Sequence, residues 1–276
     1  MSLSVNTNTA ALTALENLNK TNQNLTDIQN EISTGLSVSS AKDNASVWSI
    51  AQGQRADINS LASVKSSLNR AASIADVTNT AGSEVSDLLV QLREKVVSAM
   101  DPSLSTTSRT ALNADYQATL RQISQVVNSA SFDGANILNG SLTSNIQFLA
   151  NAQGNSFITL STKDMSLSGP IITLAATSTI NTVTSATSNL ALLDASLANV
   201  NQALGDLGAQ SSQISAHITF VGKLSDTLTS GVGNLVDADM AKDSARLQAL
   251  QVQQQLGAQS LSIANQAPQV VLSLFR

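Results

Sequence analysis

The segment LASVKSSLNRAASIADVTNTAGSEVSDLLVQLREKVVSA, residues 61–99, carries the clearest structural signal in the chain. Its apolar residues recur at alternating steps of three and four, which places them on one stripe of a helix. Only Thr78 and Gly82 interrupt the stripe. The pattern predicts one helix over about residues 44–99. Its intramolecular seam includes Leu61, Val64, Leu68, Val85, Leu89, Leu92 and Val96.

A second seam of the same period runs through residues 188–236, with only Ser211 and Ser225 as polar exceptions. Its members include Leu193, Leu197, Val200, Leu204, Ile214 and Val221. At about 1.5 Å per residue, such a helix spans roughly 70 Å, which exceeds the diameter of a small domain. We therefore expect a mainly α fold, an elongated antiparallel bundle or coiled coil of long helices.

A third helix is predicted over about residues 105–130, folded back on the first after a break at Pro102. The helical period then disappears between about residues 132 and 185. The sequence NIQFLANAQGNSFITLST has β-type residues on both sides of residues 153–155, which predicts one small β-hairpin. The Ser/Thr-rich tract that follows, to about residue 187, is expected to be an exposed connection with a short strand around residues 171–174.

The two ends of the chain carry weaker seams. The first places Asn22 and Gln29 between apolar residues, and the last is rich in Gln and Ser. Such ends bury too little apolar surface to offset the ordering of the chain, which costs about 1–2 kcal/mol per residue. We expect them to be disordered in the monomer and to order when copies meet, so that they drive self-assembly. The residues assigned to self-assembly are Leu15, Leu18, Leu25, Ile32, Leu247, Leu250, Leu261, Val271 and Leu274.

A helix stop and a polar turn separate the amino-terminal end segment from the long helix. Gly35 offers a helix stop, and SVSSAKDN follows it. Either Ser39 or Ser40 is expected to cap the next helix, with Asp43 in its first turn.

Composition excludes several functions. The 276 residues carry a net charge of −5 and no basic stripe, so nucleic acid is not an expected partner. Cysteine is absent, which removes disulfides and thiolate chemistry. The amino-terminal segment lacks the basic and apolar regions of a cleaved signal peptide, and no stretch approaches a membrane span.

Catalytic, cofactor and metal sites are not expected either, so the chain is not predicted to be an enzyme. The single His217 has no second His or Cys with which to bind a metal, and a solvated or subunit-facing position is expected for it. Asp237 and Asp239 are expected to lie near the positive end of the last helix, where acidic side chains are favourable, and not to form a cation site. The Gly-rich segments GANILNG and TSGVGNL lack phosphate-binding spacing.

Both ends resemble the bacterial flagellin family. The matching segments are SVNTNTAALTALENLNKTNQNL and ISTGLSVSSAKDNASVWSIAQGQRADI at one end, and DADMAKDSARLQALQVQQQLGAQSLSIANQAPQVVLSLFR at the other. SFDGANILNG resembles the loop that closes the family's amino-terminal half. The resemblance covers nearly the whole chain and implies a short flagellin without large outer domains.

The resemblance also implies an organisation and a set of partners. Residues 1–38 and 237–276 would be filament-core helices, residues 39–140 and 188–236 the helical rod, and residues 141–187 a short variable region. Copies of the same chain, and other flagellins, would be the partners in an extracellular filament used for motility. The flagellar type III export apparatus, a chaperone, and hook-junction and cap proteins would be further partners.

Some residues depart from the family pattern. Asn44 replaces the second acid of an SAKDDAA-like turn, Ser37 replaces a common basic residue, and Trp48 stands where a small or aliphatic residue is usual. Trp48 is expected to pack between helices or to contact another subunit. In the segment that resembles one recognised by vertebrate innate receptors, only Arg93 and Glu94 match, so receptor activation stays open.

Two other functions remain as alternatives at this stage. A hook–filament junction protein shares the helical ends but serves in few copies. An exported coiled-coil protein that binds a host target would have little reason to carry the closing segment QAPQVVLSLFR.

Overall fold

The computed structural model describes residues 7–273, with side chains as far as residue 266. The chain divides into two compact units, each described by itself below. The middle unit comprises residues 57–226, and the terminal unit comprises residues 1–56 and 227–276. Helices α2 (Ala45–Ala99) and α4 (Val183–Val236) contribute residues to both units.

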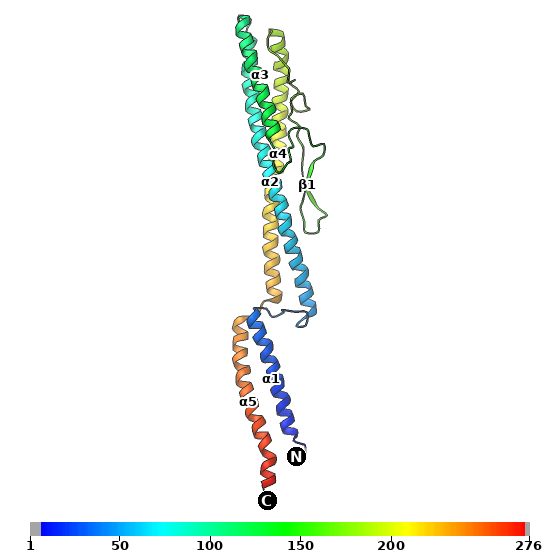
Figure 1. The fold of residues 1–276 in the computed structure, drawn as a ribbon, viewed down its shortest axis with the longest axis vertical. Helices are drawn as coiled ribbons and strands as arrows, with labels where there is room; N and C mark the ends of the chain where they lie inside the picture. The colour runs from blue at the N-terminus through cyan, green and yellow to red at the C-terminus, as the bar shows by residue number, and fades with distance from the viewer. Residues whose placement is uncertain (1–6, 274–276) are drawn as a thin grey trace. The chain divides into compact units, whose positions relative to one another are not determined.

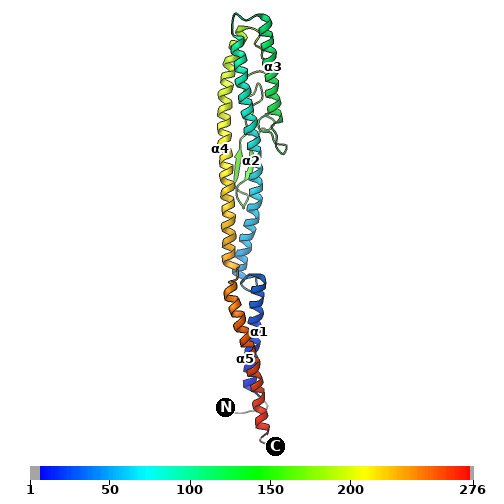
Figure 2. The same cartoon turned by 90° about the vertical axis from the view of Figure 1, so that its left-hand side faces the viewer.

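In the middle unit, α2 and α4 lie side by side and run antiparallel (Figures 1 and 2). The Arg93 side chain forms an ion pair with Asp194 at 2.7 Å, and the hydroxyl of Ser86 donates to the Asn201 side chain at 3.2 Å. As residue numbers rise along α2 they fall along α4, which defines the antiparallel register. The mainly α fold predicted from the two seams is confirmed, with two helices of 55 and 54 residues.

The seam of α2 forms the core of this unit: all seven of its predicted members are buried. On α4, Leu193, Val200, Ile214 and Val221 are buried, whereas Leu197 and Leu204 are half-exposed. Ser196 and Ala203, one position earlier, take the buried places instead. The heptad spacing of α4 is thus as predicted, but one of its two rows is shifted by one residue.

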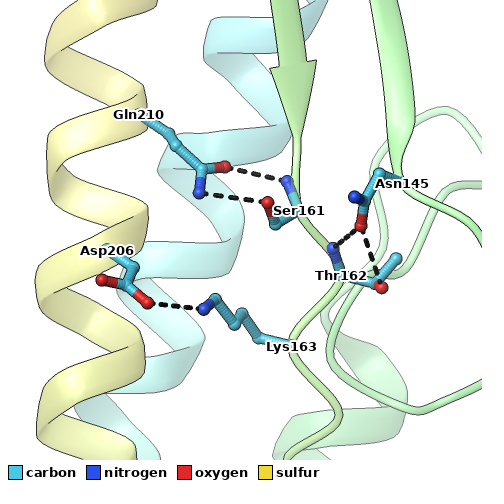
Figure 3. Close-up of polar contacts among 6 residues, drawn as sticks. All are labelled: Asn145, Ser161, Thr162, Lys163, Asp206 and Gln210. Atoms are coloured by element: carbon cyan, nitrogen blue, oxygen red, sulfur yellow. Dashed lines mark hydrogen bonds and ion pairs between the residues drawn. The ribbon is translucent and has the colours of Figure 1, made fainter.

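A polar stripe on α4 explains the shift, because the loop region is hydrogen-bonded along it. The Thr173 backbone N–H donates to the hydroxyl of Ser196 at 3.1 Å, and the Asn189 amide donates to the Thr179 carbonyl at 2.8 Å. Further along, the Gln210 side chain accepts from the backbone N–H of Ser161 and donates to its hydroxyl (Figure 3). The stripe consists of Asn189, Ser196, Asn199, Asp206, Gln210 and His217, spaced by three, four or seven residues.

Helix α3 (Thr106–Ser129) folds back beside α2 in both views (Figures 1 and 2), as predicted. The hydroxyl of Ser105 accepts from the Ser108 N–H at 3.1 Å and caps the helix. At the end of α2, the buried Arg109 donates to the carbonyls of Ala99 and Asp101. The Ala99 carbonyl is one that a helix end leaves without an intrahelical donor, so one arginine of α3 closes α2.

The predicted hairpin is present as β1 (Ile146–Leu149) paired antiparallel with β2 (Phe157–Leu160). Gly154 adopts φ 71° in the connecting loop. The hairpin is tied to α4 at its loop, where Nε2 of His217 donates to the Ala150 carbonyl at 2.7 Å. Below the strands, Lys163 forms an ion pair with Asp206 at 2.7 Å (Figure 3).

The connection after the hairpin differs from its prediction. It is packed and not exposed, because Met165, Ile172, Leu174 and Ile180 are all fully buried. The short strand predicted around residues 171–174 is reduced to one isolated bridge between Leu167 and Ile172. The Thr182 hydroxyl accepts from the Ser185 backbone N–H, and the Thr182 backbone N–H donates to the Ser185 hydroxyl. This capping box starts α4 at Val183, earlier than the start predicted at residue 188.

The terminal unit pairs α1 (Thr9–Thr34) with α5 (Met240–Ser273), side by side in Figure 1. The pair is antiparallel. Gln254 donates to the Asn22 side chain at 2.7 Å, and Leu18 packs against Gly257. At one end, the N–H of Ala238 donates to the Gly35 carbonyl at 3.0 Å, which ties the two connecting segments together.

The turn between α1 and α2 also differs in detail from its prediction. Gly35 ends α1 with φ 70°, as predicted. Asp43, however, precedes the helix. One of its carboxylate oxygens accepts from the backbone N–H and hydroxyl of both Ser39 and Ser40 at 2.9–3.1 Å. The cap of α2 is Asn44, whose side chain accepts from the Val47 N–H at 3.1 Å. Asparagine is a strong capping residue, which accounts for its presence in this turn.

Candidate assembly surface

The seam between α1 and α5 determines which apolar side chains of the terminal unit are already covered. On α1, most positions with reduced exposure follow steps of three and four: Ala11, Ala14, Leu18, Thr21, Leu25, Ile28 and Ile32, with Asn22, Asn24 and Glu31 beside them. On α5 they are Asp243, Leu247, Leu250, Gln254, Gly257, Leu261 and Ala264. Thr21 and Ile28 are the buried members of the α1 seam. Asn22, placed there from the sequence, is half-exposed and accepts a hydrogen bond from Gln254 of α5, whereas Gln29 is exposed.

Most residues assigned to self-assembly from the sequence lie in this intramolecular seam. Leu250 is buried, and the others are half-exposed: Leu18, Leu25, Ile32, Leu247 and Leu261. Their first role in the structure is to hold α1 against α5. Leu15 is different, because 43% of it is exposed. The side chain of Val271 and the whole of Leu274 lie outside the described residues.

A second apolar stripe runs along α5 on the face turned away from α1. It consists of Val252, Leu256 and Ile263, which are 56%, 61% and 61% exposed. At about 100° per residue, these three positions fall within one narrow sector nearly opposite the seam positions Leu250 and Leu261. Helix α5 is thus apolar on two opposite faces, of which α1 covers one.

Next to the seam, an open groove of about 400 Å³ lies at the end of the pair that holds the start of α1. Its apolar walls come from Ala11, Leu12 and Leu15 of α1 and from Leu261 of α5. Leu12 is 59% exposed. The groove and the α5 stripe together make the assembly surface, defined as Leu12, Leu15, Val252, Leu256, Leu261 and Ile263. Exposed apolar surface of this kind marks an interaction site.

The other end of the pair is acidic. Glu31 of α1 is half-buried, and its pKa is raised, first by desolvation and then by the neighbouring carboxylate of Asp243. Arg246 opposes the rise, whereas Asp27 and Asp43 add to it. The serine contacts of Asp43 hold the pKa of its carboxyl below the ordinary value. This end therefore pairs two carboxylates, Glu31 and the buried Asp243, across the seam.

The remaining residues considered from the sequence have plain structural roles. His217 is half-buried against the hairpin, which corrects the solvated or subunit-facing position expected for it. Asp239 caps α5 by accepting from the N–H of Ala241 and of Lys242. Trp48 is half-buried on α2. Arg93 and Glu94 are exposed, and recognition of this segment by a receptor stays a prediction.

Within the described part of the chain, histidine and acidic side chains form no group of three or more that could hold a metal ion. Over the same residues, no helix combines the length and apolar character needed to cross a bilayer.

Sequence reasoning missed four members of the assembly surface: Leu12, Val252, Leu256 and Ile263. The spacing of the three on α5 was visible, since steps of four and seven keep side chains on one face. The strongest apolar row on each helix predicts one seam, and a row alone does not specify which of two apolar faces the partner helix covers.

Comparison with known proteins fits this geometry. The family model for the bacterial flagellin N-terminal helical region matches residues 5–143, and that for the C-terminal helical region matches residues 190–275. Flagellin FljJ of Caulobacter vibrioides is 53% identical, over 100% of this chain and 99% of its own. A flagellin of Brucella melitensis is 38% identical, over 99% of each chain.

Among solved structures, a chain from Vibrio parahaemolyticus assigned as a flagellar hook-associated protein superposes with a TM-score of 0.56. It covers 71% of this chain and 100% of its own at 14% identity, which supports the fold alone. The family rests on the two matched helical regions and on the full-length relatives. The chain belongs to the bacterial flagellin family, and it is a structural subunit of the flagellar filament.

Proposed function

We propose that the α1–α5 pair is the part of this filament subunit that joins one copy to the next. The observation that carries the proposal is the second apolar face of α5, formed by Val252, Leu256 and Ile263. Burying one such side chain contributes about 1.5–3 kcal/mol, so three exposed on one face of α5 favour a state in which another surface packs over them. Copies of the same chain, packed around one another, supply the cover.

The same surface favours assembly that is coupled to ordering. Among the described residues of the α1–α5 seam, only Ile28 and Leu250 are buried large hydrophobic side chains. So small a core does not offset the cost of ordering two long segments. We expect residues 1–38 and 237–276 to be disordered in the free chain and to fold as copies meet. The middle segments 39–140 and 188–236 then act as a preformed helical rod, and residues 141–187 as its short variable region.

An open polymer follows from the type of contact. The stripe on α5 and the groove beside Leu12 are different surfaces, so a contact between them is heterologous. A heterologous contact whose rotation does not close produces a helical filament of unlimited length.

The proposal is tested by making the stripe polar without touching the seam. In Leu256→Gln/Ile263→Gln, each change removes apolar burial worth about 1.5–3 kcal/mol, so the critical concentration for polymerisation should rise about tenfold or more per residue. It is measured by sedimentation of polymer after seeding with filament fragments. The matched control is Leu192→Gln, which changes an exposed leucine of the middle unit and should leave the critical concentration within about twofold.

Two outcomes would contradict the proposal. One is a double variant that polymerises as well as the control. The other is a chain shortened by residues 2–36 or 237–276 that still forms long filaments.

We also propose that the subunit reaches the cell exterior without a cleaved signal peptide, through the flagellar type III export apparatus. A chaperone, hook-junction proteins and a cap protein would be its partners on that route. Family membership supports this route. The measurement is the intact mass of protein recovered from filaments, and loss of a leader segment from that mass would contradict it.

A hook–filament junction role is the second candidate, favoured by the structural likeness to a hook-associated protein. A junction protein serves in few copies. Purified protein that stops at short oligomers under seeded conditions would favour the junction, whereas filaments that lengthen with added protein favour the filament subunit.

A further inference from the structure

The Asn8 side chain serves both terminal helices at once. Its Oδ1 accepts from the backbone N–H of Ala11 at 3.1 Å and caps α1. Its Nδ2 donates to the backbone carbonyl of Ala264 on α5 at 2.7 Å. One amide therefore connects the first residue before α1 to a point 256 residues later in the chain.

The acceptor on α5 is an unusual one. In an α-helix, the carbonyl of residue i accepts from the N–H of residue i+4. For Ala264 that residue is Pro268, which has no N–H, and α5 continues through it to Ser273. The helix itself leaves this carbonyl without its usual donor, and the Asn8 amide supplies one. The pairing therefore depends on a proline of one helix and an asparagine before the other.

The location links this contact to assembly. Asn8 lines the same groove as Ala11, Leu12, Leu15 and Leu261. A bond at this end fixes α1 along α5, and thus fixes which apolar side chains face each other across the groove. Further along the seam the register is also held by the hydrogen bond from Gln254 to Asn22 and by Leu18 against Gly257, so the Asn8 contact adds to these at the open end of the pair.

We infer that Asn8 is a positioning residue for filament assembly, and that it acts by donating to the carbonyl that Pro268 leaves free. This rests on the proposed function of the α1–α5 pair. It adds a contact that sets the register of α1 along α5 as the two ends order. The contact between Asn8 and Ala264 lies at the open end of the pair and is distinct from the apolar stripe on α5.

The test uses variants that separate the two roles of Asn8. Asn8→Asp keeps an oxygen that caps α1, and aspartate is as good a cap as asparagine, but it removes the donor to Ala264. Pro268→Ala returns an N–H to α5, so the Ala264 carbonyl no longer needs Asn8. Asn265→Asp adds the same charge to the same groove without altering the contact, and serves as the control.

The readout is the critical concentration of the full-length chain in seeded polymerisation. With Pro268 present, Asn8→Asp should raise it about fivefold, the effect of losing one hydrogen bond. In the Pro268→Ala background the same change should matter less than about twofold. Asn265→Asp should stay within about twofold of the unaltered chain.

The outcomes distinguish the inference from the function on which it rests. Equal effects of Asn8→Asp in both backgrounds, or an effect of Asn265→Asp as large as that of Asn8→Asp, would overturn the inference and leave the proposed function standing. An unaltered chain that does not polymerise from seeds would overturn the proposed function, and the inference with it.

Discussion

Gly82 shows at the residue scale why one position in the α2 seam lacks a side chain. A Cβ built there would lie 2.6 Å from Cδ2 of Leu204, with the Met165 side chain at 3.7 Å behind it. A contact that short forces Leu204 to move. The glycine that interrupts the apolar pattern is thus the point where the Leu204 side chain of α4 packs against the α2 backbone.

Gly82→Ala should therefore raise the free energy of unfolding by less than the gain in helix propensity of about 1 kcal/mol, because the half-exposed Leu204 side chain must shift to admit the methyl group. The matched control is Gly205→Ala on α4, where an added Cβ meets nothing within 4 Å. That change should raise the free energy of unfolding by about 1 kcal/mol. Denaturant unfolding followed by circular dichroism compares the two, and equal gains would contradict the close-approach explanation.

A second residue-scale prediction concerns pH. The folded pKa of Glu31 is raised above its ordinary value of 4.5, so the folded state binds the proton more tightly than the unfolded state. Stability of the α1–α5 pair should then fall as pH rises from about 4.5 through the raised pKa. Burial and the carboxylates of Asp243, Asp27 and Asp43 cause the rise, and Arg246 opposes it.

The measurement is the thermal midpoint of filament dissociation between pH 4.5 and 7. Glu31→Gln should raise the midpoint at pH 7 and flatten its pH dependence, whereas Glu94→Gln, an exposed change in the middle unit, should do neither. Because the pKa of Asp43 is lowered from its ordinary value of 3.8, its contribution to stability is present above that pH and is lost only below it, outside this window. A midpoint that rises with pH between 4.5 and 7 would show that the sign is wrong.

At the scale of elements, the helices begin and end where side chains satisfy their free backbone groups. Asn44, Ser105, Thr182 and Asp239 cap α2, α3, α4 and α5 with short polar side chains. The end of α2 is closed from another element, by the guanidinium of Arg109 on α3. Capping therefore joins α2 to α3 at the turn around Pro102.

Arg109→Met should destabilise the middle unit by about 2 kcal/mol, since it keeps much of the side-chain volume but removes the donors to two carbonyls. Arg109 is only 7% exposed, so water cannot readily replace it. Arg121→Met, an exposed arginine on the same helix, is the control and should change the free energy of unfolding by less than about 0.5 kcal/mol. Similar losses for both variants would indicate a general effect of charge on α3.

The elements also show what could be predicted from the sequence. Apolar periodicity located α2, α3 and α4 to within about five residues at each end, because repeated burial on one face leaves a strong pattern. The same pattern placed Leu197 and Leu204 in the core, where Ser196 and Ala203 are buried instead. The reason is that the polar stripe of α4 binds loop segments that lie far away in the sequence. Contacts such as His217 with Ala150, and Asn8 with Ala264, join residues with no periodic relation, so no local signal announces them.

On the scale of the whole molecule, the two units differ in how much core each one has. The middle unit buries Leu68, Leu89, Leu92 and Tyr116 completely, among many others. The terminal pair buries little more than Ile28 and Leu250 among its described residues. Local opening follows from small buried area, so the two units should differ strongly in stability.

Hydrogen exchange should reveal that difference directly. In the unpolymerised chain, amides of α1 and α5 should exchange at least about a hundredfold faster than those of α2 around Leu89, and in filaments both sets should be protected. Mass spectrometry of peptic fragments resolves the two sets within one sample, so the middle unit is the internal control. Strong protection of α1 and α5 before assembly would show that their ordering is not coupled to polymerisation.

The distribution of chromophores gives this chain two natural optical probes. Its single tryptophan, Trp48, belongs to the terminal unit, and its single tyrosine, Tyr116, is buried in the middle unit against the hydroxyl of Ser178. Indole emission responds to the polarity around the ring, so fluorescence excited at the red edge reports on one unit and is silent about the other. The growth of a filament can thus be followed in unlabelled protein, by light from a ring in the unit that carries the assembly surface.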